Sequence, residues 1–211
     1  TMGDPSGIGP EVVIKTFLNI KNYFKCVIVG DPLVFREMVD LLNCDLKINT
    51  INNIKEALYK PDTIDIFISS NLKKVPKFSV LHAENGKVAF KSIIKSIELV
   101  KDNLISGIVT APINKEAFHL AGIKYPGHTE ILTDYNSNKN VAMMLVNKEI
   151  KTVLVTLHCS LLDAIKQINL DKELYAIKLA HKGAVMLGIK KPVIAVAALN
   201  PHAGEGGLFG N

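Results

Sequence analysis

The chain has 211 residues, of which 48% are hydrophobic and 21% are charged, and its formal net charge is +5. This composition is typical of a globular protein, and the length allows one or two domains. The lysines are scattered as single residues and pairs, such as 73–74 and 190–191. Such a surface suits anionic metabolites and disfavours nucleic acid, for which a basic stripe would be expected.

Several protein classes are excluded by what the sequence lacks. No apolar run approaches the roughly 20 residues that span a bilayer. The first residues, TMGDPSGIGPE, show neither the basic nor the apolar region of a secretory signal. The three cysteines, Cys26, Cys44 and Cys159, show no CxxC spacing, which argues against a disulfide framework and a cysteine zinc site. We therefore expect a cytoplasmic protein.

In the first half of the chain, apolar runs of strand length alternate with helical patterns. The apolar runs predict buried strands at 26–30, 46–51, 65–70 and 106–112. Helical spacing predicts helices over 31–42 and 86–101. Strands that are apolar on both faces and are separated by helices indicate an α/β protein with a largely parallel sheet.

The second half repeats this alternation. The pattern predicts strands at 141–146, 151–158 and 192–199, the first two as an antiparallel pair that turns at 147–148. A helix is expected over 161–188, with a break near 169–171, where Asp171 could cap the second piece. The polar stretch 119–140 is the predicted domain crossover, which gives domains 1–120 and 121–211.

Both ends of the sequence lie at glycine-rich turns. The chain opens on one such turn without a preceding strand, and it stops directly after another. A βα unit that delivers a loop normally continues into a helix. We therefore expect residues 1–211 to be part of a longer protein whose C-terminal residues would complete the first domain.

Two loops at predicted strand ends could bind anions, because ligands of open α/β sheets bind beyond the carboxyl ends of the strands. GDPSGIGPE (3–11) contains Asp4 and leads into a helix whose N-terminus could hold an anion. TAPINK (110–115) places Lys115 near a helix start. The alternatives are a plain tight turn for the first loop and a solvated lysine for the second.

A third loop, PGHTE (126–130), places His128 and Thr129 where backbone N–H groups of a helix start are free. The two residues could bind a phosphate or carboxylate together. The alternative is that Thr129 only caps the helix and that His128 is a surface residue.

His158 and His202 are candidate metal ligands. His158 ends the predicted strand 151–158, and His202 follows the predicted strand 192–199 in a loop that also holds Asn200. Imidazole is a common ligand of zinc, cobalt, nickel and iron, but a catalytic site needs three protein ligands. The alternative is that each histidine is a hydrogen-bonded structural residue.

The order and spacing of GDPSGIGPE, TAPINK, PGHTE, VTLH and LNPHAGEGG resemble the 4-hydroxythreonine-4-phosphate dehydrogenase family of pyridoxal phosphate biosynthesis. The resemblance covers essentially the whole chain. It implies an α/β fold like that of isocitrate and isopropylmalate dehydrogenases, with three α/β/α layers, two domains and a cleft between them. It also implies a homodimer with a shared active site.

The resemblance implies an NAD- or NADP-dependent enzyme that uses a divalent metal (zinc, magnesium or cobalt). Such an enzyme oxidises and decarboxylates 4-hydroxythreonine-4-phosphate to 3-amino-2-oxopropyl phosphate. His158 and His202 match two of the three metal histidines of the family, and His128 and Thr129 match its substrate-binding pair. The third histidine lies in a YHDQG-type motif that this sequence does not contain.

Two alternatives remain open at the level of sequence. Related dehydrogenases with similar motifs act on phosphorylated four-carbon acids or on cis-dihydrodiols. A non-catalytic module that binds a metal or an anion would also account for histidines and glycine-rich loops at strand ends.

Overall fold

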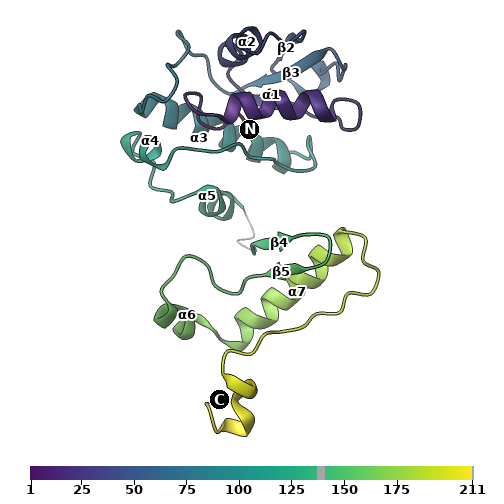
Figure 1. Ribbon diagram of the computed structural model, residues 1–211, viewed down its shortest axis with the longest axis vertical. Helices are drawn as coiled ribbons and strands as arrows, with labels where there is room; N and C mark the ends of the chain where they lie inside the picture. Colours follow the sequence, from purple (N-terminus) through teal and green to yellow (C-terminus); the bar gives the residue numbers. More distant parts are fainter. Residues whose placement is uncertain (137–140, 211) are drawn as a thin grey trace. The chain divides into compact units, whose positions relative to one another are not determined.

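The computed structural model describes residues 1–136 and 141–210, which divide into two compact units, Thr1–Ser137 (unit 1) and Asn138–Asn211 (unit 2) (Figure 1). The domain bounds 1–120 and 121–211 stay a prediction. The expected crossover 119–140 contains a helix, and its last four positions lie outside the described residues. None of the helices in the described part combines the length and apolar character that crossing a membrane requires.

Unit 1 is built around a parallel three-stranded sheet. Its first elements are α1 (Gly9–Ile20), β1 (Ile28–Gly30), α2 (Pro32–Leu41), β2 (Lys47–Ile51), η1 (Ile54–Glu56) and β3 (Thr63–Ile68). The strand order is β1-β3-β2, and both pairs are parallel. The predicted strands at 26–30, 46–51 and 65–70 and the helix at 31–42 are thereby confirmed, with ends that differ by one or two residues.

Helices cover both faces of this sheet (Figure 1). On β3, Ile64 and Ile66 pack in one cluster with buried side chains of α1 and α2. Phe67 points to the opposite face, where it packs with Leu99 of α3 (Ala83–Lys101). The period of two along the strand therefore gives unit 1 the expected α/β/α layering.

The long helix α3 also contacts α4 (Lys115–Leu120) and α5 (His128–Tyr135). It begins three residues before the predicted start at 86, because the His82 imidazole accepts a hydrogen bond from the Glu84 backbone N–H and caps the helix. At Gly86 a Cβ would lie only 2.2 Å from the Ala117 carbonyl oxygen. This position therefore needs glycine for α3 and α4 to meet.

The prediction of a strand at 106–112 is wrong: the structure assigns no strand there. This segment receives single backbone hydrogen bonds instead, from the Thr1 nitrogen to Val109 and from the Asp4 N–H to Pro112. Residues 1–4 are held on their other side by the bond from Met2 to Val29 of β1. An apolar run becomes a strand only where a neighbour supplies a continuous ladder.

Unit 2 opens with an antiparallel hairpin of β4 (Met144–Val146) and β5 (Lys151–Val153). Its turn lies at the predicted place, where the Asn147 side chain accepts hydrogen bonds from the N–H groups of Glu149 and Ile150. The helices α6 (Leu161–Gln167) and α7 (Leu170–Met186) follow, and they are separated where a break was expected. The cap of α7 is Asn169, not Asp171, since the Asn169 side chain accepts from the Lys172 N–H.

In unit 2 the predicted strand 151–158 is confirmed only in its first three residues, and the predicted strand 192–199 is wrong. β5 ends at Val153, five residues before His158, and no strand is assigned to 192–199. Val193 in the second segment is 98% exposed and Val196 is 58% exposed. Apolar β-branched residues such as these favour a buried strand. In the described part of the chain, however, no strand pairs with this segment.

Candidate functional site

The first two predicted loops lie together in unit 1. The Asp4 backbone N–H donates a 2.9 Å hydrogen bond to the Pro112 carbonyl oxygen. Gly3 has a φ of +74°, and a Cβ on it would lie 2.4 Å from the same oxygen. The glycine therefore permits a backbone approach that no other residue could make.

The Asp4 carboxylate is partly withdrawn from solvent at this junction. Its Oδ1 accepts a 2.9 Å hydrogen bond from the Ser6 backbone N–H. Burial raises the pKa of Asp4, although the Ser6 hydrogen bond lowers it. A carboxylate repels anions, so an anion at this loop would have to be bound by the backbone N–H groups at the start of α1.

Lys115 is the first residue of α4, as predicted, and it is exposed. The preceding Asn114 caps the helix by accepting a hydrogen bond from the Ala117 N–H. This cap fixes the backbone of the TAPINK loop and leaves the long lysine side chain to reach into solvent. A role for Lys115 in binding an anion stays a prediction.

His128 and Thr129 are the first two residues of α5, which begins after Gly127. The helix is anchored by Ile131, which is fully buried in the cluster with Phe118 and Ile93. The His128 Nε2 atom is buried without a hydrogen-bond partner within the described structure. Burial, followed by the positive charge of the chain's N-terminal ammonium group, lowers the pKa of His128. The imidazole is therefore neutral near pH 7, and the hydrogen-bonding capacity of its Nε2 atom is not used within the described structure.

The two candidate metal ligands both lie in unit 2, on bends of the chain. The φ angles of His158 and His202 are +47° and +50°, and both residues are exposed. The His202 ring lies 6.2 Å from the ring of Phe209. Left-handed backbone at non-glycine residues costs energy and is concentrated at functional sites. Among residues 1–136 and 141–210, no group of three or more His, Cys, Asp or Glu side chains could hold a metal ion.

Asn200, predicted in the same loop as His202, lines a hollow of unit 2 with a volume of about 640 Å³. The polar side chains in its lining are Asn169, Glu173 and Asn200, and the apolar ones include Val196 and Leu199. The glycine-rich segment brings its backbone to this hollow without side chains that would fill it. The structure thus places Asn200 beside the start of α7.

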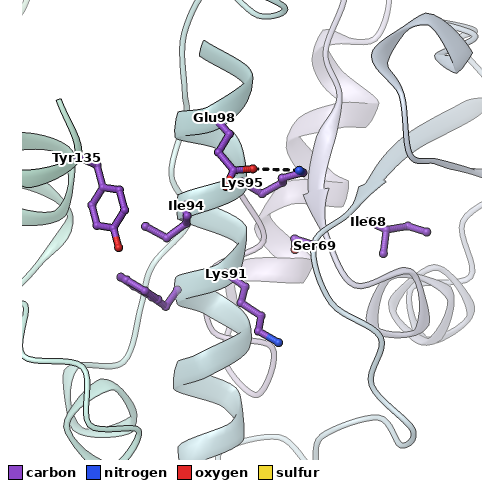
Figure 2. A pocket seen from close by; sticks show the side chains of 8 residues that line it. Ile68, Ser69, Lys91, Ile94, Lys95, Glu98 and Tyr135 are labelled. Carbon is purple, nitrogen blue, oxygen red and sulfur yellow. Dashed lines mark hydrogen bonds and ion pairs between the residues drawn. The ribbon is translucent and has the colours of Figure 1, made fainter. Parts of the chain in front are cut away.

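Unit 1 contains a second hollow, of about 440 Å³, that was not expected from the sequence. Figure 2 shows that it extends along α3, with Tyr135 to one side of the helix and Ile68 and Ser69 to the other. Lys91 and Lys95 face it from successive turns of α3. Lys95 is paired with Glu98 at 3.0 Å. The available sequence signal was the i, i+4 spacing of the two lysines.

The layered sheet and the loops at its carboxyl edge define an α/β protein of the kind found in solved dehydrogenases. The structure aligns over its whole length with a 4-hydroxythreonine-4-phosphate dehydrogenase from Burkholderia phymatum, with a TM-score of 0.86 and 35% identity, and it covers 64% of that chain. The expected fold class is therefore confirmed.

The chain belongs to the family described as pyridoxal phosphate biosynthetic protein PdxA, whose model matches residues 22–211. It is 49% identical over 211 residues to the 4-hydroxythreonine-4-phosphate dehydrogenase of Beijerinckia indica and covers 63% of that protein. It is 38% identical over 213 residues to the D-threonate 4-phosphate dehydrogenase of Cupriavidus necator and covers 64% of it. The chain thus spans slightly less than two thirds of the length of these relatives.

Proposed function

We propose that this chain is part of an NAD- or NADP-dependent dehydrogenase that oxidises and decarboxylates 4-hydroxythreonine-4-phosphate. The observation that carries the proposal is the family membership, since a relative named for this activity is 49% identical over the whole chain. The neutral, half-buried imidazole of His128 at the start of α5 is compatible with it.

The proposed reaction has two balanced steps. In the first, the secondary alcohol of the substrate loses a hydride to the oxidised nicotinamide cofactor and a proton from its hydroxyl, which leaves a ketone. The product of this step is a β-keto acid. In the second step the bond between its α-carbon and the carboxylate breaks, carbon dioxide leaves, and the α-carbon takes up a proton. The final product is 3-amino-2-oxopropyl phosphate.

In this proposal His128 and Thr129 bind the substrate. The lowered pKa of His128 keeps the imidazole uncharged, so it can donate one hydrogen bond to a phosphate or carboxylate oxygen without the cost of burying a cation. Thr129 lies in the first turn of α5, where backbone N–H groups lack helical partners. The two side chains and the helix start together favour an anionic group.

His158 and His202 are proposed as two ligands of a divalent metal. Two exposed imidazoles on left-handed bends of one compact unit suit zinc or cobalt in their donor chemistry. They would make up only part of a site, since a catalytic metal needs three protein ligands and the described residues include no group of three. A metal held there would supply Lewis-acid chemistry, lowering the pKa of the substrate hydroxyl and polarising the ketone.

We propose that the third ligand comes from residues beyond this chain and that the whole protein is a homodimer with a shared active site. In unit 2, large apolar side chains such as Leu161, Leu170 and Met186 are more than 75% exposed. Surface of this kind is typical of regions that another part of a protein or a partner covers. Light scattering on the whole protein would test the dimer, and a monomeric mass would contradict it.

A second candidate activity is the oxidation of D-threonate 4-phosphate, which the 38% identical relative from Cupriavidus necator favours. The two substrates differ at the carbon beside the carboxylate, which carries an amine in one and a hydroxyl in the other. Both contain the phosphate and the carboxylate that His128 and Thr129 are proposed to bind.

A substrate panel with the whole protein tests the proposal. We expect NADH or NADPH formation, read by absorbance, with 4-hydroxythreonine-4-phosphate and divalent metal present. Faster turnover of D-threonate 4-phosphate or of a cis-dihydrodiol would assign the chain to a sister activity. No turnover of any of them, together with retained metal or phosphate binding, would favour a non-catalytic binding module.

The metal ligands are tested by replacing each histidine singly. We expect His158→Ala and His202→Ala to abolish metal-dependent cofactor reduction and to lower the bound metal measured by elemental analysis. His181→Ala is the matched control, because His181 is an exposed histidine of the same unit that lies within α7. Wild-type turnover and metal content in either of the first two variants would contradict their assignment.

A further inference from the structure

Asn85, in the first turn of α3, is hydrogen-bonded to the segment 78–81. This segment is hydrogen-bonded to Ser6, which lies close to Asp4 in the sequence. The Asn85 side-chain nitrogen donates a 3.0 Å hydrogen bond to the Val80 carbonyl oxygen. The Ser6 hydroxyl donates to the same oxygen at 2.9 Å. Asn85 and Ser6 are each only 4% exposed. One carbonyl group therefore joins the start of α3 to the loop between residues 3 and 9.

Further hydrogen bonds extend this connection to the candidate site. The Ser79 N–H donates to the Ser6 carbonyl oxygen at 2.8 Å, and the Val80 N–H donates to the Ser6 hydroxyl at 3.1 Å. The Ser6 N–H donates to the Asp4 carboxylate, and the Asp4 N–H donates to Pro112. An unbroken series of contacts thus runs from Asn85 to the TAPINK loop.

The segment 78–81 is held by buried polar contacts in addition to partial apolar packing. The side chains of Phe78, Val80 and Leu81 are all between 42% and 48% exposed. Asn85 and Ser6 supply the buried polar contacts that fix the backbone of this segment at Val80. Buried hydrogen bonds of this kind fix geometry, because a buried group that loses its partner is destabilised by its own desolvation.

We propose that Asn85 is a positioning residue for the candidate ligand-binding edge: through Val80 and Ser6 it sets the place of Asp4 and of the backbone at Pro112. The inference rests on the proposed dehydrogenase function, because it requires that a ligand binds at this edge. Asn85 itself makes no contact with the ligand. Its effect is on the geometry of the loops that do.

The test compares Asn85→Ala with Ser96→Ala in the whole protein. Ser96 is a matched control in the same helix, since it is 1% exposed and its hydroxyl donates a buried hydrogen bond to the Ser92 carbonyl, within α3. We expect Asn85→Ala to speed amide hydrogen exchange in residues 3–9 by about tenfold, the effect of one lost buried hydrogen bond. We also expect it to lower kcat/KM by about tenfold or more well below the melting temperature. Ser96→Ala should lower only the melting temperature.

Either of two results overturns the inference: unchanged exchange in residues 3–9 of Asn85→Ala, or faster exchange there with wild-type kcat/KM. If Asn85→Ala does not fold, Asn85→Ser removes the same contact with a smaller cavity, and the same criteria apply. If the wild-type protein oxidises neither proposed substrate, the proposed function fails, and the exchange comparison alone decides whether Asn85 positions the loop.

Discussion

Unit 1 and unit 2 differ in how they bury their apolar side chains. In unit 1, α1 and α2 cover one face of the sheet and α3 covers the other, so that Phe35, Ile66 and Ile93 are fully buried. In the described part of unit 2 the buried hydrophobic residues are Ala176 and Ala184, whereas Val193 and Leu170 are exposed. The substrate-binding candidates lie in the first unit and the metal-binding candidates in the second.

The difference indicates what holds the candidate residues within each unit. The His128 helix is fixed by its own unit, because Ile131 packs in a core that unit 1 completes by itself. His158 and His202 lie on exposed bends of a unit with little core of its own. Apolar packing within unit 2 therefore constrains these two residues less than the core of unit 1 constrains His128.

The largest contrast is expected from truncating one large apolar side chain in each unit. Phe35→Ala removes a fully buried ring and should lower the free energy of unfolding by about 3–5 kcal/mol. In the 211-residue chain on its own, Leu161→Ala removes a side chain that is 76% exposed, and it should change stability by less than about 0.5 kcal/mol. Urea denaturation followed by circular dichroism measures both. A loss at Leu161 equal to that at Phe35 would show that unit 2 is covered in solution.

A second contrast concerns the helix caps of the two units. Asp31 caps α2, is 1% exposed and accepts hydrogen bonds from Leu33, Ser70 and Leu72, so Asp31→Ala should cost about 3 kcal/mol or more. Asn169 caps α7 at an exposed position, and Asn169→Ala should cost about 1 kcal/mol. Equal losses in the same denaturation experiment would remove the distinction between a buried and an exposed cap.

A third contrast comes from one helical glycine in each unit. Alanine favours a helix over glycine by about 1 kcal/mol, but at position 86 its Cβ would lie 2.2 Å from the Ala117 carbonyl oxygen. Gly86→Ala should therefore destabilise the protein by about 1–3 kcal/mol. At position 183 the nearest atom is the Met144 sulfur at 2.9 Å, the end of a flexible side chain. Gly183→Ala should be neutral or slightly stabilising, and thermal melts of both variants give the signs.

The smallest effect is expected from pH at His128. Its pKa is lowered in the folded state, so the unfolded chain binds a proton more readily. The neutral form contributes stability that is fully present above the unfolded pKa of about 6.5 and is lost as pH falls through the lowered folded pKa. His128→Gln should therefore reduce the loss of stability between about pH 7.5 and pH 5. Exposed His181→Gln is the control, and an equal reduction in both variants would contradict a special role for His128.

Among the predicted strands, those that pair with a neighbour in their own unit were the ones that the sequence predicted well. The runs around Ile28, Ile48 and Ile66 became strands because they pair with one another in one unit. The runs at 106–112 and 192–199 have the same apolar character, yet neither is a strand here. The apolar composition of a run favours a strand. A strand forms only where a second strand pairs with it through backbone hydrogen bonds, and the run itself does not specify that second strand.

The candidate site was predictable only in part for a related reason. The position of His128 at a helix start followed from local signals, namely Gly127 before it and the helical pattern after it. His158 was expected at a strand end, but β5 stops at Val153. The contact of Asp4 with Pro112 joins residues that are more than 100 positions apart. Gly3 was the local sequence signal for this contact. A glycine permits a close backbone approach, but it does not identify the segment that approaches.

The bend at His202 has a consequence for the handedness of the chain. From His202 to Gly206 all five residues have positive φ angles, between 43° and 84°. A left-handed conformation costs roughly 1–2 kcal/mol for each L-residue that has a Cβ. A D-amino acid adopts the same backbone conformation without this steric cost. Ala203, with a φ of 53°, is thus a position where D-alanine fits the backbone better than the natural enantiomer. Protein ligated from synthetic peptides with D-alanine at this position should hold the loop of His202 more firmly than the ribosomal product does.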